Sequence, residues 1–322
     1  MSINQFDLIE TIVLSRALFT AAEFNLAENL EHGPQSLATL AALTGADAAT
    51  LARLLYFLCL KNIFTREQDG TYSLPKDSYH LLEDHGASIK PFLLHDDETR
   101  WNSFGHLSYS IKTGKPAFDM LYGHDYFTSL KKNPVLSERF DKAMNSISSN
   151  EDTAIAQQLI FNGKIADIGG GNGQLLRKIL TNQAAVSTAI LFDLPNVVEL
   201  VQETPKLQCI GGSFFEPLNI NAETLILKRI LHDWTDEQAL AILHEVVATM
   251  APESELVIIE GVLDKAEEPS MLAAIDLLLL SIFGGKERTL AQFNTLITQA
   301  GLTIFKIIPI TPILSGIYCR KQ

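Results

Sequence analysis

The sequence contains few cysteines and has a deficit of positive charge. Its three cysteines, Cys59, Cys209 and Cys319, are too few and too far apart for a disulfide framework or a metal-binding knuckle, and they predict reduced thiols in a cytoplasmic protein. The net charge of −13 argues against nucleic acid as the main partner, because proteins bind it with Lys and Arg that neutralise phosphates.

The sequence also lacks any segment that predicts export or insertion into a membrane. Residues 1–7 show no basic start followed by an apolar core, so we expect no secretory signal. The most apolar stretch, residues 271–283, is too short to cross a bilayer and contains Asp276. Hydrophobic residues make up 47% of the chain, which is ample for packed cores, and a length of 322 residues fits two domains.

Residues 1–90 predict a mainly helical domain of the winged-helix type. Apolar residues recur at helical spacing over 9–30, and Ser36 and Asp47 can each cap a further helix. Two short strand candidates follow, joined through an Asp-Gly pair at 69–70, which is a strong hairpin signal.

A winged helix raises the alternative of a DNA-binding regulator. The helix over 48–60 would then read base edges, which requires polar and basic side chains. Apart from Thr50 and Arg53, this segment is mostly apolar. We therefore expect the domain to form a homodimer, with the excess of apolar residues over 9–30 as the contact surface.

Residues 91–150 predict a helical connection that contains aromatic stretches. Trp101, Phe140 and Met144 are candidates for the lining of an apolar pocket that receives a flat ligand. For each of them taken alone, packing into a core is the simpler interpretation.

Residues 151–322 predict an α/β domain with a doubly wound, Rossmann-like sheet. Strand and helix patterns alternate from Lys164 onward, which indicates a mostly parallel sheet. Thr235 and Gln238 form a capping box at the start of an amphipathic helix that runs to Met250. The main strand candidates cover residues 164–168, 188–193, 224–228 and 256–260.

A glycine-rich loop follows the first of these strands, at the place where such sheets bind ligands. The run from Asp167 to Gly173 has neither the glycine spacing of the dinucleotide fingerprint nor the Lys-Ser/Thr of a phosphate-binding loop. A second acid, Asp193, ends the next strand, where a carboxylate can accept hydrogen bonds from both hydroxyls of a ribose. A glycine loop beside these acids suits a nucleoside that carries an amino-acid ammonium group, and S-adenosylmethionine is such a ligand.

Four motif-like segments occur in order along the chain. They are Asp167-Ile168-Gly169-Gly170-Gly171-Asn172-Gly173, then Phe192-Asp193-Leu194-Pro195, then Leu227-Lys228-x-x-Leu231-His232-Asp233-Trp234-x-Asp236-Glu237, and then Gly284-Gly285-Lys286-Glu287-Arg288-Thr289. Together they resemble the small-molecule O-methyltransferases of the caffeic acid/hydroxyindole type, and the resemblance covers almost the whole chain. It implies a methyltransferase sheet, an N-terminal dimerisation domain and conversion of S-adenosylmethionine to S-adenosylhomocysteine.

The resemblance also implies roles for individual residues at the cofactor site. The glycine loop would hold the methionine portion, Asp193 the ribose, and Lys228 would lie near adenine. Where the family usually has Asp at the next adenine position, this chain has Ser213, which can hydrogen-bond but supplies no carboxylate. The full set of cofactor candidates is Asp167, Gly169, Gly171, Gly173, Asp193, Leu194, Ser213, Phe214 and Lys228.

His232 is the candidate general base. A phenol has a pKa of about 10, so at neutral pH its proton must be removed as the oxygen attacks the methyl group, and a histidine can accept that proton. The resemblance implies that Glu260 and Glu287 flank this histidine, and a carboxylate bonded to one ring nitrogen would fix its tautomer. No catalytic metal is expected.

The acceptor is expected to be a small aromatic molecule, such as a hydroxylated polyketide, a phenolic acid, a quinol or an alkaloid. Asp233 and Leu279, which lies in a leucine-rich stretch, complete the candidates for the substrate side. The alternative function is a non-methylating enzyme of cyclisation, decarboxylation or hydroxylation on the same cofactor-binding scaffold, because fold does not fix function.

Overall fold

The computed structural model describes residues 5–322, which form two compact units. The first unit comprises the chain up to Trp101 together with Ser129–Ile147, and the second comprises Asn102–Thr128 together with Ser148–Gln322. Each unit has hydrophobic core residues of its own. The three-part division into 1–90, 91–150 and 151–322 stays a prediction.

The first unit begins with two helices where the sequence pattern predicts one. α1 (Gln5–Glu23) and α2 (Leu26–Glu31) are separated at Asn25, whose backbone is left-handed with φ of 52°. The prediction of a single helix over 9–30 is therefore wrong in this respect. Both helices bury apolar residues in one core, so the apolar spacing continues across the break and does not reveal it.

The two capped helices of this unit and the hairpin are confirmed. The side chain of Ser36 caps α3 (Leu37–Thr44), and that of Asp47 caps α4 (Ala48–Leu60), each by accepting a backbone N–H of the first turn. The hairpin strands are shorter than the sequence suggests and pair antiparallel; they are β1 (Thr65–Arg66) and β2 (Tyr72–Ser73).

The chain between this hairpin and the large sheet is helical. Its elements are η1 (Lys76–Leu81), α5 (Lys90–His95), α6 (Glu98–Gly105), α7 (Leu107–Thr113), α8 (Ala117–Tyr122), α9 (Tyr126–Lys132) and α10 (Pro134–Gln158).

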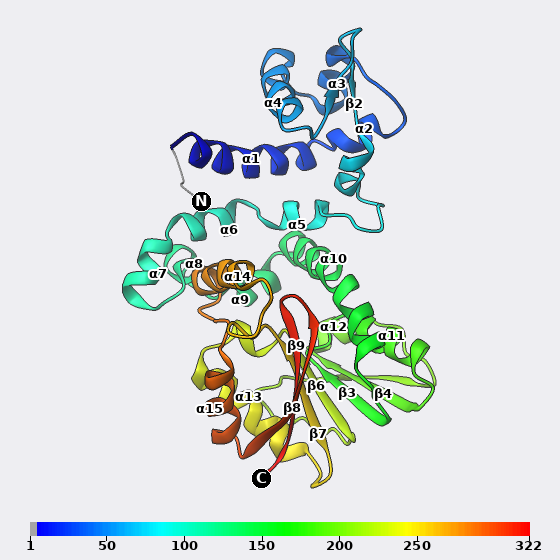
Figure 1. Cartoon of the computed structure of the whole chain (residues 1–322), viewed down its shortest axis with the longest axis vertical. Helices are drawn as coiled ribbons and strands as arrows, with labels where there is room; N and C mark the ends of the chain where they lie inside the picture. Colours follow the sequence, from blue (N-terminus) through cyan, green and yellow to red (C-terminus); the bar gives the residue numbers. More distant parts are fainter. Residues whose placement is uncertain (1–4) are drawn as a thin grey trace. The chain divides into compact units, whose positions relative to one another are not determined.

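The second unit is built on a seven-stranded sheet, which Figure 1 shows around the labels β3, β4, β6, β7, β8 and β9. The strand order is β5-β4-β3-β6-β7-β9-β8; the first five strands are parallel, and β9 runs antiparallel to both β7 and β8. The mostly parallel, doubly wound sheet is thus confirmed, and the C-terminal antiparallel pair is an addition to it. The strands are β3 (Gly163–Ile168), β4 (Val186–Asp193), β5 (Leu207–Gly211), β6 (Thr224–Lys228), β7 (Glu255–Glu260), β8 (Leu302–Thr311) and β9 (Leu314–Lys321).

Helices cover both faces of this sheet. One core joins α13 and α15 to strand residues that include Ala166, and the other joins α11 and the end of α10 to residues that include Ile165. Consecutive residues of β3 thus enter opposite cores, as the alternation of side chains along a strand requires. The helices are α11 (Gln174–Asn182), α12 (Pro195–Val198), η2 (Leu231–Asp233), α13 (Asp236–Thr249), α14 (Pro269–Ile282) and α15 (Leu290–Gln299).

Across residues 5–322, no single helix is both long and apolar enough to cross a membrane. Only the pair of α3 and α4, taken together, meets that criterion, and the two helices are bent by 111° at the break between them.

Candidate active site

The predicted cofactor residues lie at the carboxyl ends of four parallel strands of the second unit. The glycine loop follows β3, Asp193 ends β4, Ser213 lies two residues after β5, and Lys228 ends β6. Because β3 pairs with β4 on one side and with β6 on the other, these ends meet at one edge of the sheet. This is the point where the strand order reverses, which is where doubly wound sheets bind ligands.

The glycine loop turns through three left-handed residues. Gly169, Gly171 and Gly173 have φ of 75°, 59° and 74°, values that other residues rarely adopt. Nothing lies within 4 Å of the place where a Cβ on Gly171 would stand, so the loop faces open space there. Gly173 is also the N-cap of α11, whose first backbone N–H groups therefore lie beside the loop.

Asp193 is tied to this loop by its carboxylate. One oxygen accepts from the backbone N–H of Gly171 at 2.8 Å, and the other accepts from that of Leu194 at 2.7 Å. Burial raises the pKa of Asp193, and the two N–H groups oppose that rise. The carboxylate is thus held at the edge of the sheet, where its further lone pairs can accept hydrogen bonds from a ligand.

Asp167 is a buried carboxyl group directly beneath the loop. It is 2% exposed, and its Oδ1 has no hydrogen-bond partner. Burial raises the pKa of Asp167 to about 7, and the charge of Lys228 opposes this only in part. A Cβ on Gly170 would stand 2.6 Å from Asp167 Oδ2, so only glycine fits where the chain passes over this carboxyl group. A buried carboxyl group with one oxygen that lacks a partner suits a cationic ligand at this edge.

Ser213 and Phe214 follow the end of β5. Ser213 Oγ accepts from the backbone N–H of Phe215 at 3.2 Å. The ring of Phe214 comes within 3.6 Å of the Cβ position of Gly169, so it contacts the loop itself. The contribution of these residues and of Lys228 to adenine binding stays a prediction.

His232 lies in η2, directly after β6, and is 8% exposed. Its Nδ1 makes a hydrogen bond of 3.0 Å with Glu287 Oε1 and lies 3.8 Å from Glu260 Oε2. On the other side of the ring, Nε2 lies 3.6 Å from Asp233 Oδ1, which is too long for a hydrogen bond. With Nδ1 engaged by a carboxylate, Nε2 is the nitrogen that can accept a proton.

The charges around the imidazole favour its protonated form. Burial lowers the pKa of His232, but the carboxylates of Glu260, Asp233 and Glu287 outweigh burial and raise that pKa to about 9. For Glu260, burial raises the pKa and the imidazolium opposes the rise.

The two glutamates hold different parts of the site. Glu287 Oε1 bonds the ring of His232, whereas Glu260 Oε1 accepts from the backbone N–H groups of Ile230 and Leu231 at 2.9 and 2.8 Å. Glu260 therefore fixes the loop that carries the histidine, and Glu287 fixes the ring.

The segment after α14 binds the backbone around His232. Lys286 N–H donates to His232 O at 2.8 Å, and Arg288 donates to Leu231 O at 2.7 Å and to Trp234 O at 3.0 Å. A Cβ on Gly285 would overlap the carbonyl oxygen of His232, so the two backbones meet only because residue 285 is glycine.

A charge network missed by the sequence analysis continues from this cluster to α10. Lys228 Nζ lies 2.6 Å from Asp152 Oδ1, and Arg229 makes two hydrogen bonds to Glu151, at 2.5 and 3.3 Å. The two acids are more than 70 residues away from Lys228 and Arg229 along the chain, so no local pattern indicated the pairs. The one visible signal was two adjacent basic residues at the end of a buried strand.

The substrate candidates divide between the two units. Trp101, Phe140 and Met144 belong to the first unit, where Trp101 and Phe140 make ring contacts and Met144 is half-buried. Asp233 and Leu279 belong to the second unit, with Asp233 beside His232 and Leu279 buried in α14. Their role toward an acceptor stays a prediction.

A cluster of stacked rings in the second unit joins the aromatic stretch before α10 to the His232 segment. Phe127 stacks on Trp234 and on Phe283, with ring centroids 5.5 Å apart in both pairs. Trp234 also meets Phe214 edge-on, and Phe214 contacts the glycine loop. Of this cluster, only Phe214 was predicted from the sequence as a site residue.

His232, Glu260 and Glu287 are also close enough to hold a metal ion, since one ligand atom of each lies within 4.8 Å of the others. Their hydrogen bonds point to a different use, because Glu287 bonds the ring nitrogen and Glu260 bonds backbone N–H groups. A carboxylate bonded to one ring nitrogen in this way fixes the tautomer of the histidine.

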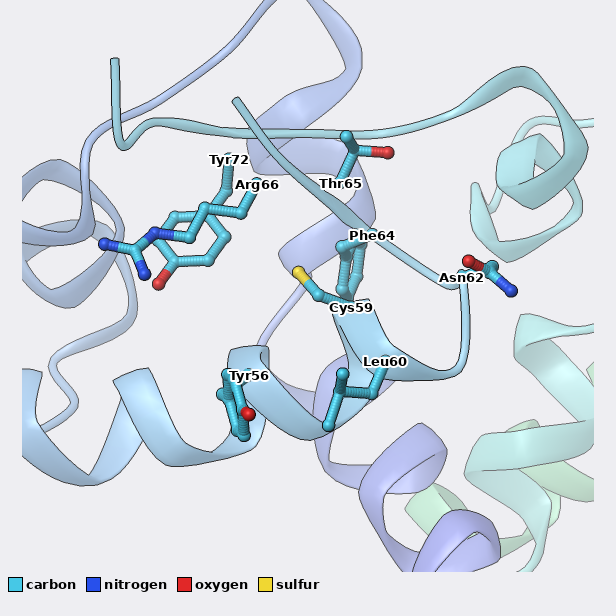
Figure 2. Close-up of a pocket in the computed structure, with 8 residues that line it drawn as sticks. All are labelled: Tyr56, Cys59, Leu60, Asn62, Phe64, Thr65, Arg66 and Tyr72. Carbon is cyan, nitrogen blue, oxygen red and sulfur yellow. The ribbon is translucent and has the colours of Figure 1, made fainter. Parts of the chain in front are cut away.

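A hollow in the first unit, shown in Figure 2, lies between the end of α4 and the hairpin. It contains none of the predicted site residues. Its lining residues are Tyr56, Cys59, Leu60, Asn62, Phe64, Thr65, Arg66 and Tyr72.

Two family sequence patterns match the chain. The O-methyltransferase domain matches residues 104–303, and the O-methyltransferase dimerisation domain matches residues 6–84.

Individual proteins resemble the chain over nearly its whole length. The 2,7-dihydroxy-5-methyl-1-naphthoate 7-O-methyltransferase of Streptomyces carzinostaticus is 33% identical over 306 residues, which cover 92% of this chain and 91% of that protein. The structure of a mitomycin 7-O-methyltransferase matches with a TM-score of 0.93 and 28% identity, over 98% of this chain and 96% of that one. An O-methyltransferase from neocarzinostatin biosynthesis, solved with S-adenosylmethionine and 2-hydroxy-5-methyl naphthoic acid, matches with a TM-score of 0.88 and 30% identity over the full length of both chains.

Proposed function

Since this chain belongs to the family of O-methyltransferases with a dimerisation domain, we propose that it methylates a hydroxyl group of a small aromatic natural product. The relatives support this acceptor class: one is named for a dihydroxynaphthoate, and another was solved with a hydroxynaphthoic acid beside S-adenosylmethionine. The cofactor is S-adenosylmethionine, which supplies a methyl group already activated by its sulfonium.

The residues at the edge of the sheet fit this cofactor. Asp167 offers a buried oxygen without a partner, which suits the ammonium group of the methionine portion. Asp193 is held where a carboxylate can accept both hydroxyls of a ribose, and the left-handed Gly171 leaves open space above the loop. Leu194, Ser213, Phe214 and Lys228 complete the proposed site at the neighbouring strand ends.

We propose that His232 acts as the general base. Its Nε2 would take the proton of the acceptor hydroxyl while that oxygen attacks the methyl carbon. Glu287 would hold Nδ1–H and so present Nε2 as the accepting atom, and the carboxylates around the ring would stabilise the imidazolium that forms. The observation that carries this role is the 3.0 Å bond from Nδ1 to Glu287, which leaves Nε2 as the one ring nitrogen without a hydrogen bond of that length.

Methyl transfer from labelled cofactor tests the proposed function directly. We would incubate the protein with S-adenosylmethionine labelled in the methyl group and a panel of phenols, hydroxynaphthoates and quinols, and analyse the products by mass spectrometry. Label on an acceptor oxygen supports the proposal. An acceptor that is converted without gaining the label would instead indicate the non-methylating alternative on the same scaffold.

We also propose that the chain forms a homodimer through α1. Its first turns expose Phe6, Leu8, Ile9, Ile12 and Val13, each at least 45% exposed, which is more apolar surface than one helix of a monomer ordinarily leaves in water. Residues 6–84 match a dimerisation domain, which supports this surface. Light scattering of the full chain against Ile9→Glu/Val13→Glu tests it, and a monomeric full chain at micromolar concentration would contradict it.

A further inference from the structure

Arg229 has a strained backbone and a side chain that is hydrogen-bonded to the acid Glu151. Its φ of 54° is left-handed, a conformation that costs a long side chain about 1 kcal/mol or more. Its N–H donates to Ile259 O at 3.0 Å, which fixes the residue at the end of β6. The guanidinium, 17% exposed, donates to both oxygens of Glu151 on α10, whose side chain is 9% exposed.

The same guanidinium also faces the base cluster. Arg229 Nη1 lies 3.8 Å from Glu287 Oε1, which is the oxygen that bonds His232 Nδ1 at 3.0 Å. Arg229 and His232 therefore approach one carboxylate oxygen, and the histidine has the closer position. Glu287 Oε2 is buried and has no hydrogen-bond partner, so a guanidinium that closed on this carboxylate in bidentate fashion would meet Oε2 and would compete with the imidazole for Oε1.

We propose that Glu151 holds Arg229 back from Glu287 and so reserves that carboxylate for His232, which makes Glu151 and Arg229 positioning residues of the methyl-transfer site. This inference rests on the proposed function for its catalytic meaning. Neither residue touches the reacting atoms; both act through Glu287.

The charged groups that face the imidazole come from several elements. Glu260 ends β7, Asp233 belongs to η2, and Glu287 follows α14, where its own backbone N–H donates to Asp276 Oδ1 at 2.8 Å. Beyond Glu287 lie Arg229 and then Glu151, whose pKa burial raises but Arg229 and Lys228 lower overall. The positive charge of Arg229 disfavours the imidazolium and so lowers the pKa of His232, and the negative charge of Glu151 offsets this effect.

Two single changes should therefore shift the pKa of His232 in opposite directions. In Glu151→Gln, the freed guanidinium closes on Glu287, and the pKa of His232 falls by about one unit. In Arg229→Met, one positive charge disappears while Glu151 keeps Lys228 as a cationic partner at 3.6 Å, so the pKa of His232 rises. The double variant should return close to the wild-type value, because it removes the pair as a whole.

The measurement is an NMR titration of the protein with labelled histidine, with His232 identified among the eight histidines by His232→Asn. Arg320→Met, an exposed arginine on β9, is the matched control and should leave the titration unchanged. Arg229→Lys keeps the charge and is the substitute where Arg229→Met does not fold; its titration should stay near the wild type. Equal or same-direction shifts in Glu151→Gln and Arg229→Met would overturn the proposal.

The pH dependence of methyl transfer separates this inference from the proposed function. If His232 is the base, the midpoint of the rate profile moves with its measured pKa, toward acid in Glu151→Gln and toward alkali in Arg229→Met. If the NMR shifts are opposite but the rate profile does not move, His232 is not the base, and the proposal that Glu151 and Arg229 position Glu287 still holds. If the NMR titrations of the folded variants do not move, the positioning proposal is wrong.

Discussion

The glycine loop and the cluster around His232 lie at the same edge of the sheet but are specified in different ways. The loop is one continuous segment, from Asp167 to Gly173, whose shape follows from glycines at alternate positions. The cluster is assembled from α10, the end of β6, the end of β7 and the segment after α14, which are far apart in sequence. The loop is therefore a local structure, whereas the cluster exists only in the completed fold.

This difference predicts how the two regions respond to substitution. A change in the loop acts on one or two hydrogen bonds or one backbone angle, so effects at separate positions should add. A change in the cluster alters charges that share partners, so its effects should be larger and should depend on each other.

Removing the base should have the largest effect. His232→Ala should lower the rate of methyl transfer by about a hundred- to ten-thousand-fold, because general base catalysis is worth that much, and should leave the affinity for S-adenosylmethionine within a few-fold. Single-turnover kinetics and calorimetry measure the two quantities. Full activity of the variant at neutral pH would contradict the role of His232.

The wild-type pH dependence sharpens this test. The base must be unprotonated and the pKa of His232 is raised from 6.5 to about 9, so the wild-type rate should climb with pH and level off at about pH 9. The low rate of His232→Ala should instead keep rising toward the pKa of the phenol, about 10, because the acceptor then ionises without a base. Because the folded pKa exceeds the unfolded one, the charged His232 stabilises the fold fully below pH 6.5, and that stability is lost as the pH rises through 9. Denaturant unfolding of both proteins from pH 6 to 10 measures the loss.

The same contrast explains what could be predicted from the sequence. The loop, the capping box at Thr235 and the strands around them are local patterns, and the structure has them where the sequence indicates. His232, Glu260 and Glu287 were linked only through a family resemblance, which does not tell which acid bonds the ring. Glu151 carried no signal, and Arg229 only that of a second basic residue beside Lys228, because a buried ion pair across 78 residues leaves no periodicity.

Two glycine substitutions compare the glycine loop with the cluster around His232. Gly285→Ala would push a Cβ into the carbonyl of His232 and displace the base, and a misplacement of about 1 Å can cost about a hundred-fold in rate. Gly171→Ala meets no protein atom and leaves His232 in place, but it carries the penalty of its positive φ, about 1 kcal/mol, and puts a methyl group into the space proposed for the cofactor, so it should weaken binding of S-adenosylmethionine. Calorimetry and turnover at saturating cofactor check this for both variants, and a Gly171→Ala protein as inactive at saturation as Gly285→Ala would contradict the contrast.

Asp193→Ala should weaken cofactor binding without altering the base. Loss of hydrogen bonds to a charged acceptor costs about 1.5–3 kcal/mol, which corresponds to about a ten- to hundred-fold rise in the dissociation constant of S-adenosylmethionine. Part of that loss comes from Gly171 and Leu194, whose N–H groups lose their acceptor. Calorimetry measures the affinity, and the NMR titration of His232 should be unchanged. An unaltered dissociation constant in the folded variant would refute the assignment of Asp193 to the ribose.

The smallest expected effect is a gain at Ser213, where related O-methyltransferases usually carry Asp. Ser213→Asp offers a carboxylate to the adenine amino group, and a charged acceptor exceeds a neutral one by about 1 kcal/mol, or about five-fold in affinity. Asp193 pairs with Gly211 of the neighbouring strand, two residues before Ser213, so repulsion between Asp193 and the new carboxylate should keep the gain in affinity to a few-fold.

Ser213→Asn, which is uncharged, is the matched control and should bind the cofactor as the wild type does. Combined with Asp193→Ala, Ser213→Asp should gain at least as much, because the opposing charge is gone. An equal gain from Ser213→Asn would show that the side-chain length at this position matters and its charge does not, and a loss of affinity in Ser213→Asp would place adenine elsewhere on the edge of the sheet.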